Sequence, residues 1–180
     1  MGIGTLWEVE AVEQAVKVLD FAMKMELQAR DFYLESLDEV KLETTKQLLA
    51  YLAEWEKGHY DFLKKQKESV EGNSRWDTSA EPSIDEKEGE KIVSSKKEGT
   101  PVEPPIDELT GDMAILRIAL VMETDFHNFY KNAAKNMKDE EGRKVLEMLA
   151  EWESGHQQMI NEQYSALHKD FMAEMGFEPF

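Results

Sequence analysis

The chain has 180 residues, which fits one domain, and 41% of them are hydrophobic, enough for a sizeable core. A net charge of −17 disfavours binding to nucleic acid or to an anionic membrane surface, because both need an excess of Lys and Arg. The absence of cysteine excludes disulfides, iron–sulfur clusters, thiolate zinc sites and cysteine nucleophiles, so a metal must be held by His, Asp or Glu. Neither a signal peptide nor a membrane-spanning stretch is recognisable, so we expect a cytoplasmic protein.

Apolar residues spaced by threes and fours dominate the sequence and predict long amphipathic helices. The predicted elements, in chain order, are helices at about 6–38 and 42–70, a helix that starts between Asp107 and Asp112 and runs to about Met137, a helix at about 139–168, and a C-terminal tail at 171–180. The turns inside each pair of helices are short, which makes the paired helices antiparallel neighbours. This pattern predicts two hairpins, at about 6–70 and 108–168.

The segment 71–107 differs from the rest, since it contains four of the five prolines, several glycines and few large apolar side chains. A segment of this length is unusual inside a compact domain. We interpret it as a crossover that lets the third helix return beside the first pair, so that residues 1–170 form one domain. The alternative is a disordered linker between two separate hairpins.

The second half of the sequence repeats the first at an offset of 97 residues. The segments 52–59 and 149–156 both read Leu-Ala-Glu-Trp-Glu-x-Gly-His and differ only at the sixth residue. The same offset relates Met25-Glu26 to Met122-Glu123 and Phe32-Tyr33 to Phe129-Tyr130. The two hairpins are therefore two copies of one unit.

The repeat places acidic and imidazole side chains in the apolar, inward-facing register of all four helices. These residues are Glu26, Glu56, His59, Glu123, Glu153 and His156. Burial of an ionised carboxylate is costly unless the group is paired or coordinated, and no Lys or Arg occupies the inward register nearby. Two divalent cations would balance four carboxylates, so the pattern predicts a metal site.

The spacing of these residues suits metal binding. In Glu-x-x-His the two side chains lie on one face of a helix, one turn apart, and can approach one ion or a pair of ions. One such motif is weak, but here two copies each follow another Glu by 30 residues, since 56 − 26 and 153 − 123 both give 30. Oxygen and imidazole ligands suit iron or manganese, and this set of ligands is typical of di-iron and di-manganese bundles.

Over nearly all of its length the chain resembles the ferritin-like superfamily and, within it, the rubrerythrin di-iron domain. The resemblance implies an all-α, antiparallel four-helix bundle with a long crossover between the second and third helices. It also implies that Glu56 and Glu153 bridge two iron ions. The remaining ligands would form two terminal pairs, Glu26 with His59 and Glu123 with His156.

Aromatic residues accompany the predicted ligands in both copies. Tyr33 and Tyr130 match the tyrosines that lie two turns past the terminal Glu in this family, which implies a hydrogen bond from each to a bridging carboxylate. The alternative is that they are ordinary core aromatics. Trp55 and Trp152 lie beside the ligands and are expected to pack in the core or at an interface.

The chain departs from the family pattern at two points. Phe126 stands where rubrerythrins commonly carry an extra ligand Glu, and the chain has no cysteines for a rubredoxin iron site. By resemblance we expect a non-haem di-iron protein that reacts with hydrogen peroxide or dioxygen and receives electrons from an external donor protein. Manganese is the alternative metal, and a homodimer is expected.

Two other functions stay open on the sequence alone. The first is iron handling, as a ferroxidase or in storage or delivery. The second is a structural metal in a helical interaction module.

Overall fold

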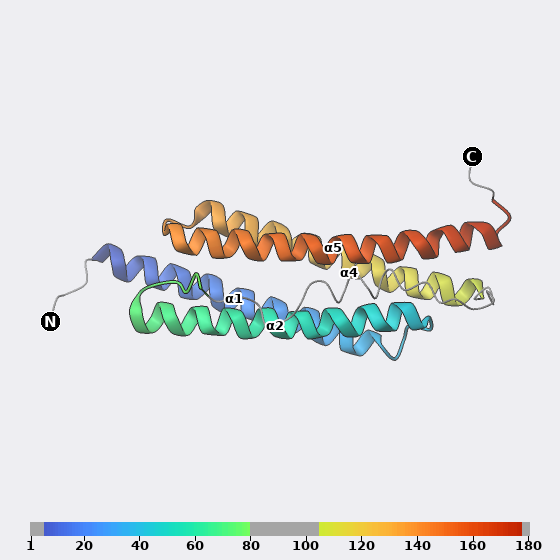
Figure 1. Ribbon diagram of the computed structural model, residues 1–180, viewed down its shortest axis with the longest axis horizontal. Coiled ribbons are helices and arrows are strands. Elements are labelled where there is room, and N and C mark those ends of the chain that lie inside the picture. The colour runs from blue at the N-terminus through green and yellow to red at the C-terminus, as the bar shows by residue number, and fades with distance from the viewer. Residues whose placement is uncertain (1–5, 80–104, 178–180) are drawn as a thin grey trace.

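A computed structural model shows four long helices assembled into an elongated bundle (Figure 1). The structure describes residues 6–79 and 105–177. The helices are α1 (Leu6–Ser36), α2 (Glu43–Asn73), α4 (Ile106–Asn136) and α5 (Glu140–Glu174). There is no β-strand in these two described ranges, and the predicted all-α four-helix bundle is confirmed.

The helices form two hairpins that lie side by side. Helix α1 packs along α2 and α4 packs along α5, while α2 with α5 and α1 with α4 form the contacts between the hairpins. In Figure 1, α1 and α5 run in one direction and α2 and α4 in the other, so each helix is antiparallel to both neighbours. Helix α2 ends at the opposite end of the bundle from the start of α4. Most of the predicted crossover, residues 80–104, lies outside the described residues.

Both helices that close a hairpin extend beyond their predicted ends. Helix α2 continues to Asn73 and stops where Ser74 adopts a left-handed conformation and donates its N–H to the carbonyl of Val70. Helix α5 continues to Glu174, past the predicted end near residue 168, so the first part of the predicted tail is helical. Its partly buried Phe171 packs against the apolar core, and this contact explains the extra length.

The apolar core consists of two clusters, one toward each end of the bundle. The first contains residues such as Leu19, Leu63 and Leu146, and the second contains Leu48 and Leu116. On α2 and α5 the buried Glu and His residues lie between segments that belong to different clusters, and on α1 and α4 the buried Glu lies near the border between the two clusters. The fold therefore holds a polar layer in the middle of the bundle, enclosed by apolar residues at both ends.

A buried carboxylate joins the two hairpins near one end of the bundle. Asp112 of α4 accepts hydrogen bonds from the backbone N–H groups of Lys41 and Leu42, at 2.8 and 3.0 Å, just before α2 begins. Leu42 itself provides no side-chain cap, so a residue of the other hairpin caps α2. This contact helps to fix the depth at which residues of the two hairpins face one another.

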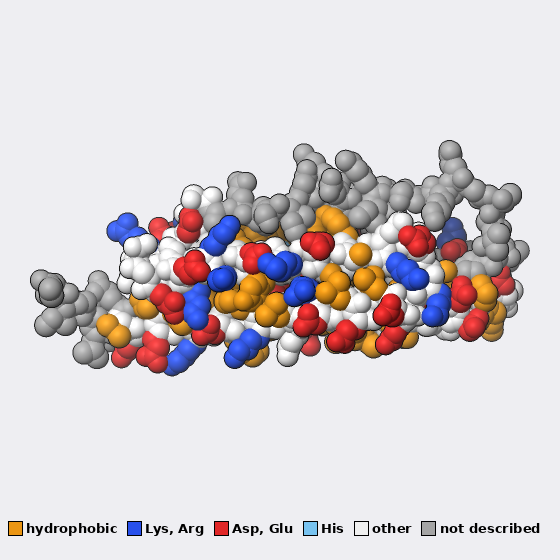
Figure 2. Space-filling model, turned by 90° about the horizontal axis from the view of Figure 1, so that it is seen from below, with side chains coloured by type: hydrophobic (Ala, Val, Ile, Leu, Met, Phe, Trp, Pro, Cys, Tyr) orange, Lys and Arg blue, Asp and Glu red, His pale blue; other side chains and the backbone are white. Residues whose placement is uncertain are grey.

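The surface is mixed in character. Figure 2 shows one long side of the molecule, where acidic and basic side chains lie among apolar ones. None of the helices in the described ranges is both long enough and apolar enough to cross a membrane.

Candidate metal centre

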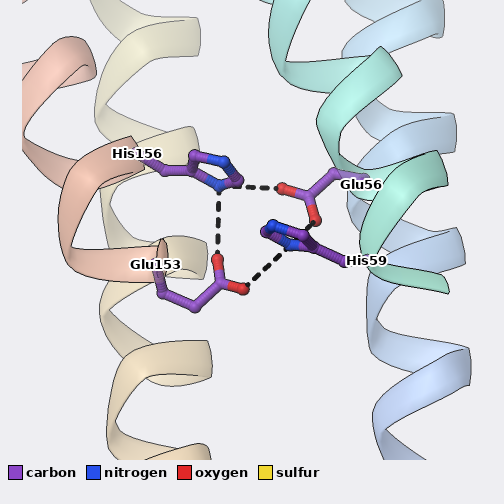
Figure 3. Close-up of side chains that lie close together, drawn as sticks. All are labelled: Glu56, His59, Glu153 and His156. Carbon is purple, nitrogen blue, oxygen red and sulfur yellow. Dashed lines mark ion pairs between the residues drawn. The ribbon is translucent and has the colours of Figure 1, made fainter. Parts of the chain in front are cut away.

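The six predicted ligand residues come together in the polar layer, and all six are buried. Helices α1 and α4 each contribute one Glu, and α2 and α5 each contribute a Glu-x-x-His pair. Figure 3 shows the pairs of α2 and α5 pointing toward one another across the bundle. The repeat explains this arrangement, because equivalent residues of two antiparallel hairpins meet at one depth.

One histidine nitrogen faces carboxylates from three helices. Nδ1 of His59 lies 3.6 Å from Oε2 of Glu26, 3.4 Å from Oε2 of Glu56 and 3.3 Å from Oε1 of Glu153. We call these four residues the His59 set.

The other histidine has an equivalent environment. Nδ1 of His156 lies 3.2 Å from Oε1 of Glu56, 3.4 Å from Oε2 of Glu123 and 3.3 Å from Oε2 of Glu153. We call these four residues the His156 set. Glu56 and Glu153 belong to both sets, and each turns one oxygen toward each histidine. Each set thus offers one nitrogen and three oxygens.

The spacing of these atoms fits metal coordination. Ligand atoms at about 2.1 Å from one ion and at right angles are about 3 Å apart, close to the observed separations. Donor atoms of Glu56, His59, Glu153 and His156 all lie within 4.8 Å of one another, a grouping that could hold a metal ion.

Most polar atoms of the six side chains have no hydrogen-bond partner among the residues that the structure describes. The atoms are Glu26 Oε2, both oxygens of Glu56, both nitrogens of His59, Glu123 Oε2, both oxygens of Glu153 and both nitrogens of His156. Unpaired buried polar atoms cost free energy, and such a concentration needs a physical reason. Coordination of hard or borderline cations by these oxygens and nitrogens would supply that reason.

The electrostatics of the cluster also favour positive charge. Burial and the neighbouring carboxylates raise the pKa of Glu56 well above 4.5, and burial raises that of Glu123 to about 7. Burial alone would lower the pKa of both histidines, yet the surrounding carboxylates hold it well above 6.5. Burial likewise raises the pKa of Glu153, but the adjacent imidazoles lower it to about 2. In the absence of a cation, protons therefore balance the carboxylates.

Two buried tyrosines connect the hairpins across the polar layer. The hydroxyl of Tyr33 donates to Oε1 of Glu123, and that of Tyr130 donates to Oε1 of Glu26. Burial and the nearby carboxylates raise the pKa of both hydroxyls well above 10, so both remain donors. The sequence predicted that each tyrosine donates to a bridging carboxylate, Glu56 or Glu153. In the structure each tyrosine donates instead to the Glu on α1 or α4 of the opposite hairpin. Side chains tilt toward the N-terminus of their helix, which turns each tyrosine back to this depth.

Aromatic rings enclose the histidines. The rings of His59 and His156 are stacked with centroids 5.1 Å apart, and Trp152 stacks on His59, also at 5.1 Å. Trp55 presents its ring edge-on to both histidines, at 5.7 and 5.4 Å. Both tryptophans are buried and therefore fix the imidazole rings and keep water from them.

Comparison with known proteins shows the family of this chain. The sequence matches the rubrerythrin family over residues 17–164, which is most of the chain. The chain belongs to the rubrerythrin family. A hypothetical protein from Pyrococcus furiosus has a similar structure, with a TM-score of 0.60 and 24% sequence identity over 92% of this chain and 93% of that one. This likeness supports the ferritin-like fold alone. No curated protein matches the chain.

Three residues lie close to the six predicted ligands without being ligands themselves. Two of them, Phe126 and His127, offer no ligand atom to the site, and Gln157 contacts the backbone of Glu123. Phe126 is buried in an apolar cluster and offers no donor atom. Nδ1 of His127 lies 2.8 Å from the carbonyl oxygen of Ala150, which keeps this imidazole away from the six residues. The side-chain amide of Gln157 donates to the backbone oxygen of Glu123 at 3.0 Å. Sequence reasoning missed this contact, because the repeat places Tyr60 at the equivalent position and gives no signal.

Proposed function

We propose that this chain is a non-haem di-iron protein that reduces hydrogen peroxide or dioxygen, as a rubrerythrin-like peroxidase or oxidoreductase. One observation carries the proposal: the His59 set and the His156 set are equivalent and share two carboxylates. Membership of the rubrerythrin family supports iron as the metal, with manganese as the alternative that the same donors suit.

The ligand roles follow from which residues the sets share. Glu56 and Glu153 would serve both ions, since each faces both histidines. Glu26 completes one site with His59. The remaining pair, Glu123 and His156, completes the other.

Charge balance favours two ions over one. Four buried carboxylates carry four negative charges when ionised, and two divalent cations neutralise them. A single cation would leave two carboxylates to be neutralised by protons in an apolar enclosure. Each set offers four protein donors, which would leave room for a small oxidant on an ion that takes about six ligands.

The residues of the chain support such a reaction in identifiable ways. Two bound ferrous ions would supply the two electrons, and the solvent the two protons, that convert hydrogen peroxide to two water molecules. Tyr33 and Tyr130 hold Glu123 and Glu26 in place and remain protonated, so they keep donating to these carboxylates. Trp55 and Trp152 exclude water from the histidine side of the layer.

Electrons must return to the site after each turnover. The sequence contains no cysteine, so this chain cannot build an iron–thiolate centre of its own. We therefore propose an external electron-donor protein as a partner.

The first test measures metal content after anaerobic reconstitution with ferrous ion. The wild-type chain should bind two ions, while Glu56→Gln and Glu153→Gln should each bind fewer, because both residues serve both sets. Glu54→Gln and Glu151→Gln are matched controls, since these glutamates are exposed and lie two residues before the bridging ones. Wild-type metal content in both bridging variants would refute the proposed site.

The second test separates the possible reactions. Ferrous protein is mixed in a stopped-flow instrument with hydrogen peroxide or with dioxygen, and oxidation is followed optically. Faster oxidation by peroxide supports a peroxidase, and faster oxidation by dioxygen supports an oxidase. Continuous uptake of ferrous ion with accumulation of ferric mineral would instead assign the chain to iron handling.

A further inference from the structure

A chain of aromatic rings leads from the two histidines toward the surface along α2. The ring of Trp55 lies 5.7 Å from that of His59 and 5.4 Å from that of His156, measured between ring centroids. One turn earlier on the same helix, the ring of Tyr51 lies 5.8 Å from that of Trp55. Trp55 is buried, whereas Tyr51 is partly exposed. Rings at these separations are in contact, so the chain connects the proposed metal ligands with solvent.

Both Tyr51 and Trp55 belong to the side chains that lose an electron most readily. An indole or a phenol gives up one electron far more easily than a phenyl ring does. The other tryptophan, Trp152, stacks on His59, but among the described residues its further ring contact is with Phe62, at 5.3 Å. The complete path from indole to phenol therefore lies on α2.

The surroundings of the two rings favour Tyr51 as the residue that finally loses the electron. Nε1 of Trp55 is buried and has no hydrogen-bond partner among the residues that the structure describes. These residues offer no base for the indole proton, so an oxidised Trp55 would remain a buried cation, which is costly. Tyr51 reaches solvent, which can accept its phenolic proton. An electron taken from Trp55 would then be replaced from Tyr51, and the neutral radical would lie near the surface.

Such an electron is needed when only one ferrous ion is present. The His59 set and the His156 set each offer four donor atoms, so either could be filled alone. Hydrogen peroxide needs two electrons to become water, and one ferrous ion supplies only one of them. Reduction of peroxide by a single electron would release a hydroxyl radical, which attacks nearby side chains. A second electron from the protein would avoid this product.

We propose that Tyr51, through Trp55, supplies the second electron when hydrogen peroxide meets a site that holds one ferrous ion. One molecule of peroxide, one ferrous ion, one tyrosine and one proton then give two molecules of water, one ferric ion and one tyrosyl radical. Peroxide gains two electrons, and the ferrous ion and the tyrosine lose one each. Because Tyr51 is partly exposed, a reductant in solution can restore it. This inference rests on the proposed function, since it requires an iron site that reacts with peroxide.

The main test uses protein loaded anaerobically with equal amounts of ferrous and zinc ions. Zinc has no redox chemistry, so many chains hold a single oxidisable ion. After rapid mixing with hydrogen peroxide and freezing, electron paramagnetic resonance should detect a tyrosyl radical, whose line shape changes in protein made with ring-deuterated tyrosine. Tyr51→Phe and Trp55→Phe should each lose most of this signal. Protein loaded with ferrous ion alone should show little radical, because iron supplies both electrons.

Tyr60→Phe is the matched control. Tyr60 also lies on α2 and is partly exposed, and its ring lies beside the ammonium group of Lys57, with 5.8 Å between Nζ and the ring centroid. This variant should keep the radical. In the fully ferrous protein, Tyr51→Phe should leave the rate of oxidation by peroxide unchanged. In the protein with iron and zinc, Tyr51→Phe should increase the amount of hydroxyl radical caught by a spin trap.

A second measurement needs no metal. Azide radicals generated by pulse radiolysis oxidise tryptophan in the metal-free protein, and optical absorption follows the transfer of an electron from tyrosine to the tryptophan radical. Tyr51→Phe should remove the fast phase of this transfer, because it takes away the tyrosine in contact with Trp55. Tyr60→Phe should retain the fast phase. Circular dichroism of each variant verifies that it is folded.

The outcomes separate this inference from the proposed function. A chain that binds no iron, or whose ferrous ions are not oxidised by peroxide, would contradict the proposed function, and the radiolysis result would still test the path between the rings. Iron that is oxidised without a tyrosyl radical would overturn this inference alone, as would a radical that survives Tyr51→Phe. A radical that is lost only in Tyr33→Phe or Tyr130→Phe would also overturn it, because the electron would then come from the buried tyrosines.

Discussion

The histidines of the polar layer are protonated when no cation is bound, because each imidazole faces three carboxylates. The pKa of His59 and of His156 therefore lies well above 6.5, although burial opposes this shift. A cation can bind Nδ1 only after the proton has left, so metal binding must release protons. We expect the affinity for ferrous or manganous ion to fall as the pH is lowered from about 8 to about 6.

Calorimetric titration at several pH values, in two buffers with different heats of protonation, measures both the affinity and the number of protons released. The sign follows from the direction of the shift: a raised pKa keeps the imidazole protonated over more of this range, and acid strengthens that competition. An affinity that is independent of pH, with no proton release, would contradict the predicted coupling.

The two tyrosine hydroxyls are expected to stabilise the metal-free protein. Tyr33→Phe leaves a buried oxygen of Glu123 without its donor, and Tyr130→Phe does the same to Glu26. An unsatisfied buried carboxylate oxygen costs about 1–3 kcal/mol, so urea denaturation of the metal-free variants should show a loss of this size. Tyr164→Phe is the control, because its hydroxyl has no such role and it should change stability little. Losses equal to that of the control would show that the two hydroxyls contribute nothing.

The repeat predicted which residues meet in the site but not which atoms pair. An equal spacing in both copies places Glu26 with Glu123 and His59 with His156 at one depth, whatever the angle between the hairpins. The partner of Tyr33 depends on how the hairpins face each other, and no local pattern encodes that relation. The prediction therefore gave the tyrosine the wrong carboxylate and still placed it beside the site.

At the scale of helices, the start of α5 depends on a close approach that only glycine allows. A Cβ atom on Gly142 would lie 2.5 Å from the indole ring of Trp76, which belongs to the chain that follows α2. Trp76 is held by packing and by Gln66, whose side chain forms two hydrogen bonds with the backbone of Asp77. We expect Gly142→Ala to destabilise the protein by about 1–3 kcal/mol, because the indole must move.

A second glycine provides the control for this prediction. Gly111 lies on α4 with no atom within 4 Å of an added Cβ. Gly111→Ala should therefore stabilise the protein, by up to about 1 kcal/mol, since alanine favours helix more than glycine does. The melting temperatures of both variants test this prediction. Shifts of the melting temperature in the same direction would refute the proposed clash with Trp76.

Helix boundaries were less predictable than the helices themselves. Periodicity identified four helices because apolar residues recur over many turns of each one. The ends depend on contacts from elsewhere, such as Asp112 capping α2 across the hairpins or Phe171 extending α5 by packing. Asp112 corresponds to Ala15 in the repeat, so comparison of the two copies gives no sign of its role.

At the scale of the whole molecule, the sequence predicted the fold class because its two halves carry the same unit. Each half forms an antiparallel hairpin whose apolar face needs a partner, and the other half supplies a matching face. What periodicity could not predict is how far each side chain outside the core is exposed to solvent. Val121 and Lys24 occupy equivalent positions, and only their exposure in the folded bundle shows that the valine is unnecessary for the core.

The polar layer should make the stability of the entire bundle depend on metal. A ligand that binds only the folded state stabilises it by about 2.7 kcal/mol per site at a free concentration one hundred times its dissociation constant. For a chain of this size each kcal/mol corresponds to roughly 2–4 °C in melting temperature. We therefore expect anaerobic ferrous or manganous ion to raise the melting temperature of the wild type by about 10 °C or more.

One substitution separates metal binding from the cost of burying charge. The pKa of Glu56 is raised well above 4.5, so this carboxyl destabilises the metal-free fold at neutral pH, where the unfolded chain would ionise it freely. Glu56→Gln removes that cost and should raise the melting temperature of the metal-free protein. It should also lose at least half of the metal-dependent gain, because Glu56 faces both histidines. Glu54→Gln should change neither quantity. A Glu56→Gln variant that keeps the full metal-dependent gain would show that this carboxylate does not hold the ions.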